Sequence, residues 1–460
     1  MKIEKLGPIT EGELKLNNMT VFIGESGSGK TYMSYVIYAI HKHIENEITK
    51  LKLVNDENFQ ELLENKELII DIDAIIKQVY KSAEKSFQEK QKQILGSTFN
   101  SPSKMFEETK LDIDYNDFPG LKVRFLKFFF LDSLPEVFFK LDDAVHLLSA
   151  QIKDNEVYIS LNPIKMGELP LNRRFMDNKK VLKNTLNRLL NQCFTMNRLV
   201  YIPAERVGLH VFRGELNKGR LDDFADLSLN SSQYREKFER DNINIPTYPE
   251  PISSYLNNLN QWFSWSKLNY KLEFSEDFRI DSIVNELLNG KFEINDKEDV
   301  FFRERFGKVR YKSQKIPLQI SSSTLKSLFG LDLYLKTGLI QSGEYLVIDE
   351  PELNLHVKSQ KILASLLYKL MENGIYVILS THSDYLVREL VNLELKNQVK
   401  ENEKVNHISC YYFSDNTINE LPSLTDVNYI ENFDDSFIEV ENEYYKLLSK
   451  VEKLKNEETS

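Results

Sequence analysis

Apolar runs of strand length alternate with segments of helical spacing near the start of the chain and in its last third. Buried strands are predicted at Met19–Ile23, Leu199–Glu205, 343–352 and 374–383. Helices are predicted at Lys30–Asn46, 323–339 and 359–373, where apolar residues recur every three or four positions. This alternation favours parallel strand pairing with helices on both sheet faces. The pattern therefore predicts an α/β fold with a mixed sheet flanked by helices.

The middle of the chain has a different character. Residues 47–195 predict a large, mainly helical insertion with some strand, including a strand at Glu156–Leu161 and a helix at Lys179–Asn191. No heptad with apolar first and fourth positions persists over several turns, so we expect no long coiled coil. The remaining expectations are strands at Lys2–Lys5 and Glu13–Leu16, a mobile polar connection at Leu216–Pro251, a strand or hairpin at 301–314, and a charged helix or tail at 436–460.

Composition fits a folded protein with more than one structural unit. At 460 residues the chain exceeds the ~250–300 residues of a single core. Its 28 Phe and 22 Tyr supply bulk for packing. The first residues lack the apolar core of a secretory signal, no run approaches the roughly 18 apolar residues of a membrane helix, and Cys193 and Cys410 form no disulfide framework. We therefore expect a cytoplasmic protein without a membrane segment.

The net charge of −11 argues against a surface coated for nucleic-acid binding, because phosphate affinity comes from clustered Lys and Arg. Local clusters of basic residues could still bind DNA. The ordinary interpretation is that one cluster lies on a solvated helix face and the other on a solvated strand face, and DNA contact is the alternative. Two such clusters occur: Arg173, Arg174, Lys179, Lys180, Lys183 and Arg188; and Arg303, Arg305, Lys308, Arg310, Lys312 and Lys315.

A glycine-rich loop lies between the strand at Met19–Ile23 and the helix that follows. In such a loop, amide N–H groups surround phosphate oxygens and the helix N-terminus adds positive potential. Lys30 is expected to reach the β- and γ-phosphates and Thr31 to bind Mg²⁺, so the loop predicts ATP and Mg²⁺ as cofactors. The residues match GxxxxGK[ST] in full: Gly24, Glu25, Ser26, Gly27, Ser28, Gly29, Lys30 and Thr31.

Two adjacent acids follow the buried strand of YLVIDEPELNLH. Placing Asp349 and Glu350 at the end of a buried strand carries an ionisation penalty unless a cation or a reaction uses them. We expect Asp349 to hold Mg²⁺, directly or through water, and Glu350 to polarise the attacking water. His382 follows the next strand, at the edge where ligands bind in parallel sheets, and its imidazole is predicted to bond the γ-phosphate.

The order GESGSGKT, SSSTLKSL, YLVIDEPELNLH and STHSDYL resembles the ABC-type ATPase heads of the SMC and OLD-like superfamily. It is similar above all to the AAA family ATPases of bacterial anti-phage defence operons, such as the ATPase subunits of PARIS-type and Septu-type systems. The likeness implies a P-loop NTPase head built from residues 1–46, 196–300 and 301–435. It also implies that two heads sandwich two ATP molecules, each site using one glycine loop and the other head's signature serine.

The signature motif of that family corresponds here to Ile320–Thr324. The resemblance implies that Ser322 and Ser323 bring a hydroxyl and a helix N-terminus to the partner's γ-phosphate, whereas a simple helix N-cap is the alternative. The glycine-rich LSGGQ form of the motif is absent, and no residue is assigned to the Q-loop. Arg206, in PAERVGL, is expected to approach either a phosphate or an acidic partner.

These features predict an ATPase that converts ATP and water to ADP and phosphate and forms a homodimer or higher homo-oligomer around nucleotide. The resemblance implies that it acts as a sensor, switch or scaffold for an effector, a nuclease or toxin encoded nearby, in anti-phage defence. One alternative is a scaffold that binds ATP but turns it over little. Another is an SMC-like ATPase of DNA repair or DNA-end processing, which the lack of coiled-coil arms weakens.

Overall fold

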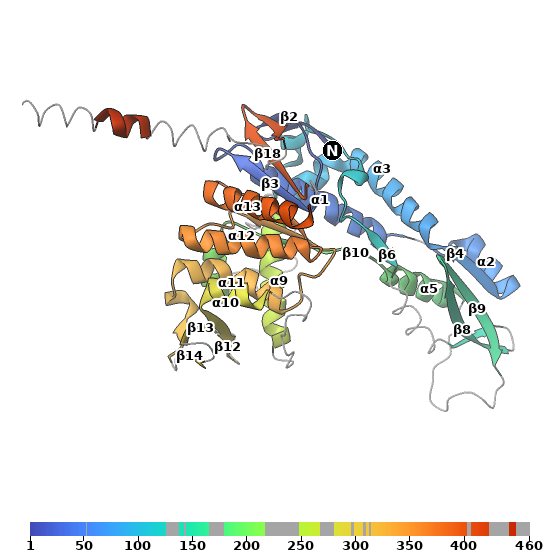
Figure 1. Ribbon diagram of the computed structural model, residues 1–460. Coiled ribbons are helices and arrows are strands. Elements are labelled where there is room, and N and C mark those ends of the chain that lie inside the picture. Colours follow the sequence, from blue (N-terminus) through green and yellow to red (C-terminus); the bar gives the residue numbers. More distant parts are fainter. Residues whose placement is uncertain are drawn as a thin grey trace, which may run out of the picture. The chain divides into compact units, whose positions relative to one another are not determined.

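The computed structural model divides into two compact units, each described by itself (Figure 1). Unit 1 comprises Met1–Tyr35, Glu108–Asp112 and Val200–Ser460, and unit 2 comprises Val36–Glu107 and Ile113–Leu199. The structure describes residues 1–51, 53–125, 138–141, 144–164, 179–216, 248–266, 280–295, 299–306, 310–311, 314–402, 406–422 and 441–447.

A nine-stranded sheet is the main element of unit 1, in the order β11-β16-β17-β3-β18-β19-β2-β1-β5. β16, β17, β3 and β18 pair in parallel, whereas β18 with β19, β2 with β1, and β1 with β5 pair antiparallel. The sheet is therefore mixed, as predicted. The strands are β1 (Lys2–Leu6), β2 (Ile9–Glu13), β3 (Met19–Gly24), β5 (Lys110–Asp112), β11 (Leu199–Ile202), β16 (Tyr345–Asp349), β17 (Tyr376–Ser380), β18 (Ile408–Ser414) and β19 (Thr417–Glu420).

The central strands are apolar along their whole length, since every residue of β3 and β16 is buried. Such burial on both faces is what helices on a parallel sheet produce. α12 packs against β17 and lies beside α13 (Figure 1). The helices are α1 (Lys30–Thr49), which crosses the boundary between the units, and α6 (Arg206–Val211), α9 (Glu250–Ser266), α10 (Asp281–Leu288), α11 (Ser323–Lys336), α12 (Val357–Glu372) and α13 (Asp384–Glu401).

A small antiparallel sheet precedes α11 in unit 1. β12 (Gly290–Ile294) pairs with β13 (Val300–Phe306), which also pairs with β14 (Arg310–Tyr311) and β15 (Ile316–Pro317). The β13–β14 pair confirms the hairpin predicted at 301–314. The 3₁₀ turn η4 (Leu318–Ile320) then leads into α11.

Unit 2 combines helices with a four-stranded antiparallel sheet, β4-β9-β8-β7, and a two-stranded ribbon, β10-β6. α3, with 27 residues, is the longest helix among the described residues, and they contain no long coiled coil. The elements are α2 (Asp56–Asn65), β4 (Glu67–Asp71), α3 (Ile72–Thr98), η1 (Ser103–Phe106), η2 (Tyr115–Asp117), β6 (Val123–Phe125), β7 (Phe138–Leu141), β8 (Ala144–Lys153), β9 (Glu156–Ile164), α5 (Lys179–Cys193) and β10 (Phe194–Met196).

One strand prediction was misplaced. The strand expected at Glu13–Leu16 is β2, Ile9–Glu13, because the chain turns at Gly7 (φ 56°) and pairs Ile9 with Leu6. Leu14 and Leu16 are buried without belonging to the strand, which explains their apolar character.

Several predicted features fall on chain that the structure does not describe. Most of the polar connection expected to be mobile, at 217–247, lies outside the described residues, as does most of the charged C-terminal segment, of which 441–447 are helical. In the part of the chain that is described, no helix is long and apolar enough to cross a membrane.

Candidate functional site

Three strands of unit 1 end at one edge of the sheet. The parallel register pairs Asp349 of β16 with Ser380 of β17, and Ser380 with Phe22 of β3. Just beyond the strands, the N–H of Glu350 donates to the carbonyl of Ser380 at 3.0 Å. The glycine loop, the acidic pair and His382 therefore follow strands that end side by side, although they lie far apart in the sequence.

The glycine loop adopts backbone conformations that other residues rarely take. Gly24, Gly27 and Gly29 have φ of 140°, 80° and 106°. A Cβ on Gly29 would lie 2.7 Å from Cγ1 of Ile9, whereas one on Gly27 would meet nothing within 4 Å. The loop leads directly into α1, whose first amides have no partner within the helix. This open loop at a helix N-terminus fits a phosphate group.

The Lys30 ammonium lies across the loop and donates to the carbonyls of Gly24 (2.9 Å) and Glu25 (2.7 Å) and to Oγ of Ser28 (3.4 Å). The residue is 6% exposed. Burial lowers the Lys30 pKa to about 8, and the nearby Glu350 carboxylate opposes that shift. A bound phosphate would favour the charged ammonium in the same way, so the site is suited to an anion.

Asp349 is 1% exposed, and its carboxylate is surrounded by hydroxyl donors. Oδ1 accepts from Ser34 (3.0 Å) and Ser380 (2.9 Å), and Oδ2 accepts from Tyr201 (2.6 Å). Burial raises the Asp349 pKa, and the hydroxyl bonds lower it. The hydroxyls hold the carboxylate in one orientation at the strand end.

The donor set at this edge fits Mg²⁺ bound together with ATP. Magnesium is usually held by one or two carboxylates, substrate phosphates and water. Asp349 supplies such a carboxylate, and Thr31 supplies an exposed hydroxyl at the start of α1. No group of three or more His, Cys, Asp or Glu side chains suited to a metal occurs among the described residues, so the phosphates would have to complete the set. The roles of Thr31 and Asp349 as ligands stay predictions.

Glu350 and His382 face each other at the partly exposed mouth of the site. Oε1 of Glu350 lies 3.6 Å from Nε2 of His382, and the two side chains are 35% and 34% exposed. Glu350 has φ 46°, an uncommon conformation that turns the chain sharply after β16. Burial lowers the His382 pKa, as does Lys30, whereas Glu350 and the Gly24 carbonyl raise it. The imidazole is therefore neutral at pH 7.

The two signature serines lie at the exposed start of α11. The Ser322 hydroxyl accepts from the Leu325 N–H at 3.3 Å and caps the helix, and Ser323 is the first helical residue. Ser322 is thus the N-cap of α11, the alternative given for it from the sequence. Contact of either serine with the nucleotide of a second subunit stays a prediction.

A family model described as "AAA ATPase domain" matches residues 1–387. The chain belongs to the AAA ATPase domain family. The matched range contains every candidate site residue of this AAA ATPase, from Gly24 to His382. ATP binding and ATP hydrolysis are the properties of the family, and the geometry of the sheet edge agrees with them.

Solved structures with some likeness to this AAA ATPase are heads of SMC proteins. They include "Crystal structure of the SmcHead bound to the C-winged helix domain of ScpA" (TM-score 0.32, 11% identity, 92% of this chain and 97% of that one). A second is the Smc head domain from Pyrococcus furiosus with an extended coiled coil, bound to the C-terminal domain of ScpA. Its TM-score is 0.32 at 12% sequence identity, and the match covers 92% of this chain and 96% of that one. The SMC head domain from Thermotoga maritima has a TM-score of 0.30 at 10% sequence identity, and the match covers 92% of this chain and 97% of that one. No curated protein matches the sequence.

Three side chains beside the candidate site residues were not predicted from the sequence. Ser34 and Tyr201 bond Asp349, and Oε1 of Glu352 accepts from the His382 N–H at 2.8 Å. Burial raises the Glu352 pKa. Ser34 lies one helical turn after Lys30, on the face that turns back towards the sheet, so its spacing could have indicated it. Nothing local distinguishes Tyr201 or Glu352.

Arg206 forms no direct ion pair with an acid among the described residues, although Glu352, Glu350 and Asp349 lie close enough to favour its charge. Its guanidinium bonds only carbonyl and hydroxyl oxygens among the described residues, including the carbonyls of Asp349 (2.9 Å) and Glu350 (2.8 Å). At 1% exposure the side chain is enclosed by the protein. Burial lowers the Arg206 pKa. Arg206 therefore contacts the backbone of the site residues Asp349 and Glu350 from inside the protein.

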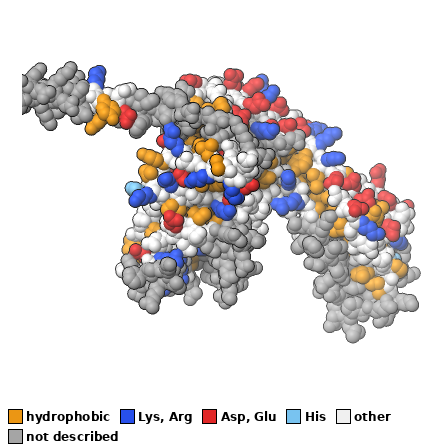
Figure 2. Space-filling view, viewed as in Figure 1, with side chains coloured by type: hydrophobic (Ala, Val, Ile, Leu, Met, Phe, Trp, Pro, Cys, Tyr) orange, Lys and Arg blue, Asp and Glu red, His pale blue; other side chains and the backbone are white. Residues whose placement is uncertain are grey.

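Three basic residues of the two clusters form ion pairs with carboxylates. Lys183 pairs with Asp56 (2.5 Å), and Arg303 and Lys315 both pair with Glu293 (3.0 and 2.9 Å). On the face shown in Figure 2, acidic and basic side chains are interspersed among the described residues. Nothing here favours DNA binding. Four members of the clusters lie outside the described residues: Arg173, Arg174, Lys308 and Lys312.

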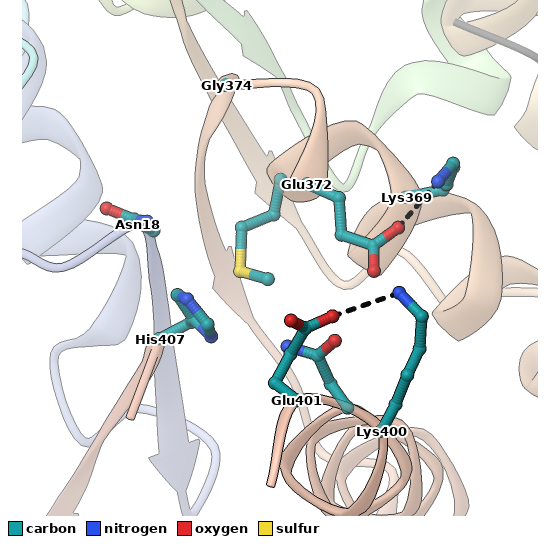
Figure 3. Close-up of a pocket in the computed structure, with 9 residues that line it drawn as sticks. Asn18, Lys369, Glu372, Gly374, Lys400, Glu401 and His407 are labelled. Carbon is teal, nitrogen blue, oxygen red and sulfur yellow. Dashed lines mark hydrogen bonds and ion pairs between the residues drawn. The ribbon is translucent and has the colours of Figure 1, made fainter. Parts of the chain in front are cut away.

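A cavity of about 560 Å³ lies at the other edge of the sheet (Figure 3). Asn18, Gly374 and His407 line it just before β3, β17 and β18 begin, so it faces the amino ends of these strands. Its two lysines are paired: Lys369 with Glu372 (2.7 Å) and Lys400 with Glu401 (3.0 Å). Ligands of parallel sheets bind at the carboxyl ends, so this cavity is not the nucleotide site.

Proposed function

We propose that this chain is a nucleotide-driven switch that binds and hydrolyses ATP at the edge formed by β3, β16 and β17. The observation that supports the proposal is the convergence of Lys30, Asp349, Glu350 and His382 on one strand edge of a family of ATPases. In this proposal the loop Gly24–Thr31 holds the phosphates.

Each side chain has a separate task in the reaction. Lys30 neutralises phosphate oxygens, and Glu350 accepts a proton from the attacking water as its oxygen approaches the γ-phosphate. His382, whose Nε2 lies 3.6 Å from Oε1 of Glu350, bonds the γ-phosphate through its imidazole in this proposal. When bound, Mg²⁺ would stabilise charge on the phosphates. Asp349, fixed by three hydroxyls, and Thr31 would hold the metal.

The switch itself is proposed to be a dimer closed around nucleotide. Ser322 and Ser323 begin an exposed helix N-terminus, which suits contact with a phosphate of the other subunit. ATP would then favour the closed state because only that state makes both sets of contacts. A scaffold that binds ATP without turnover is the competing version, and steady-state turnover separates the two.

The proposed biological role is control of a partner effector, a nuclease or toxin, in bacterial anti-phage defence. This part rests on the order of the four motifs, which resembles the ATPases of defence operons. Co-purification of the chain with the product of the neighbouring gene tests it. Failure of any neighbouring product to bind, with and without ATP, would remove the effector from the proposal.

The hydrolytic assignment is tested with two variants and two matched controls. Lys30→Ala should lose both ATP binding and turnover, whereas Glu350→Gln should bind ATP but lose turnover by at least about 100-fold. Lys42→Ala and Glu372→Gln change the same residue types in exposed ion pairs and should behave as wild type. Radiolabelled ATP measures binding, and phosphate release measures turnover. Wild-type turnover by Glu350→Gln would refute the assignment of Glu350.

A further inference from the structure

An almost fully buried charged side chain of unit 1, that of Arg206, bonds the turn that carries Glu350. Arg206 makes six hydrogen bonds with its guanidinium: to the carbonyls of Pro203, Asp349, Glu350 and Pro351, and to both the carbonyl and the hydroxyl of Ser327. None of these acceptors is charged. A buried cation is costly unless its donors are satisfied, and here the bonds tie the cation to Pro203, to the turn after β16 and to α11.

The first group of acceptors belongs to the turn after β16. Nη1 bonds the Asp349 carbonyl (2.9 Å), and Nη2 bonds the carbonyls of Glu350 (2.8 Å) and Pro351 (3.4 Å). Glu350 has φ 46°, a conformation that the surroundings must hold for a residue with a Cβ. Arg206 therefore holds the backbone that aims the Glu350 side chain.

The second group belongs to α11, the helix that begins at the signature serines. Nε bonds the carbonyl (3.1 Å) and hydroxyl (3.0 Å) of Ser327, and that hydroxyl donates to the Leu353 carbonyl (2.9 Å). One turn earlier, the Thr324 hydroxyl donates to the Asn354 carbonyl (2.7 Å). The start of α11 is thus fastened to the same turn, 349–354, by three side chains.

We propose that Arg206 is a positioning residue that fixes the backbone of Glu350 and couples it to α11 at Ser327, near the start of that helix. A displacement of α11 at Ser322 and Ser323 then moves the Glu350 turn. This inference rests on the proposed function, because it takes Glu350 as the base and the two serines as the point of contact with nucleotide. It gives each subunit a rigid connection between the contact it makes for its partner and its own water-activating carboxylate.

A lysine does not replace Arg206. Lysine keeps the charge but has three donors on one nitrogen, whereas the planar guanidinium reaches acceptors on two sides at once. Arg206→Lys should therefore retain ATP binding within about threefold and lose kcat by about 10- to 100-fold, the effect expected when a catalytic group is displaced by ~1 Å. Ser327→Ala removes the two bonds of the Ser327 hydroxyl, from Arg206 and to the Leu353 carbonyl, but leaves Arg206 bonded to the carbonyls of Asp349, Glu350 and Pro351, so its kcat should fall less.

The experiment combines kinetics with hydrogen–deuterium exchange on the full chain. In the nucleotide-free protein, Arg206→Lys should speed exchange in peptides covering 349–356 and in those covering 320–330, while Ser327→Ala should affect mainly the latter. Arg388→Lys, an exposed ion pair with Asp384, and Ser365→Ala, whose hydroxyl bonds its own helix, are the matched controls. Fluorescent ATP titration reports binding.

The outcomes separate the inference from the proposed function. If wild-type protein turns over no ATP, the proposed function fails, and the exchange data still decide whether Arg206 links the two segments. If wild type is active and both variants match it in kcat and exchange, the inference is wrong. Should Arg206→Lys fail to fold, Ser327→Ala carries the test, because a wild-type exchange pattern in 320–330 would overturn the coupling.

Discussion

The hydroxyl of Tyr201 offers the sharpest test of how the Asp349 carboxylate is held. It donates to Oδ2 over 2.6 Å, and both side chains are almost fully enclosed, at 3% and 1% exposure. Tyr201→Phe removes the donor and leaves the buried oxygen without it. Hydrogen bonds to charged groups contribute about 1.5–3 kcal/mol, so the unfolding free energy of unit 1 should fall by roughly 2 kcal/mol.

The same change should alter the pH dependence of ATP turnover. The hydroxyl bond favours the ionised carboxylate and so opposes the burial that raises the Asp349 pKa. Without the bond the pKa rises further, and the acidic limb of kcat should move to higher pH. The lost bond stabilises only the ionised form of Asp349. Once acid protonates this carboxylate in the folded state, the variant should therefore lose less stability relative to wild type than it does at neutral pH.

Tyr368→Phe is the matched control for this prediction. The Tyr368 hydroxyl also donates to a buried carboxylate over 2.6 Å, that of Glu394, which takes no part in the site. Its stability loss should be similar, with an unchanged pH profile. Urea unfolding followed by tryptophan fluorescence measures unit 1, since Trp262 and Trp265 both lie in α9. An unshifted acidic limb in Tyr201→Phe, or an equal shift in both variants, would refute the reasoning.

Two glycine substitutions give further predictions. Gly29→Ala should abolish ATP binding, because its Cβ would lie 2.7 Å from Ile9 at φ 106°, while Gly208→Ala, which meets nothing within 4 Å, should bind normally in the same titration. Gly330→Ala places a Cβ against the Tyr255 hydroxyl and should lower the stability of unit 1 by about 1–3 kcal/mol in urea; wild-type stability would contradict this packing.

Local pattern was sufficient for the elements that carry the motifs. β3, β16 and β17 are predicted from uninterrupted apolar runs, and the glycines, acids and histidine come directly after them in the sequence. The rule that parallel strands end at one edge then brings distant motifs together. The mixed sheet flanked by helices is confirmed on this basis, and the chemical roles of the site residues stay predictions.

What the sequence does not reveal depends on partners far along the chain. β4 lies in a region of helical composition and becomes a strand because it pairs with β9, from Glu67 with Ser160 to Asp71 with Glu156. Tyr201 looks like an ordinary strand tyrosine until Asp349 is placed beside it. The acceptors of Arg206 are mainly backbone carbonyls, which every residue carries, so no pattern of side chains in the sequence predicts them.

The interrupted path of unit 1 has a consequence for synthesis on the ribosome. β3, which leads into the glycine loop, is synthesised long before both neighbours that cover its edges, β17 and β18. Until then an apolar strand has two open edges, which favours association with other chains. Nascent or truncated chains that stop before Ile408 are therefore expected to depend on chaperones and to bind no ATP.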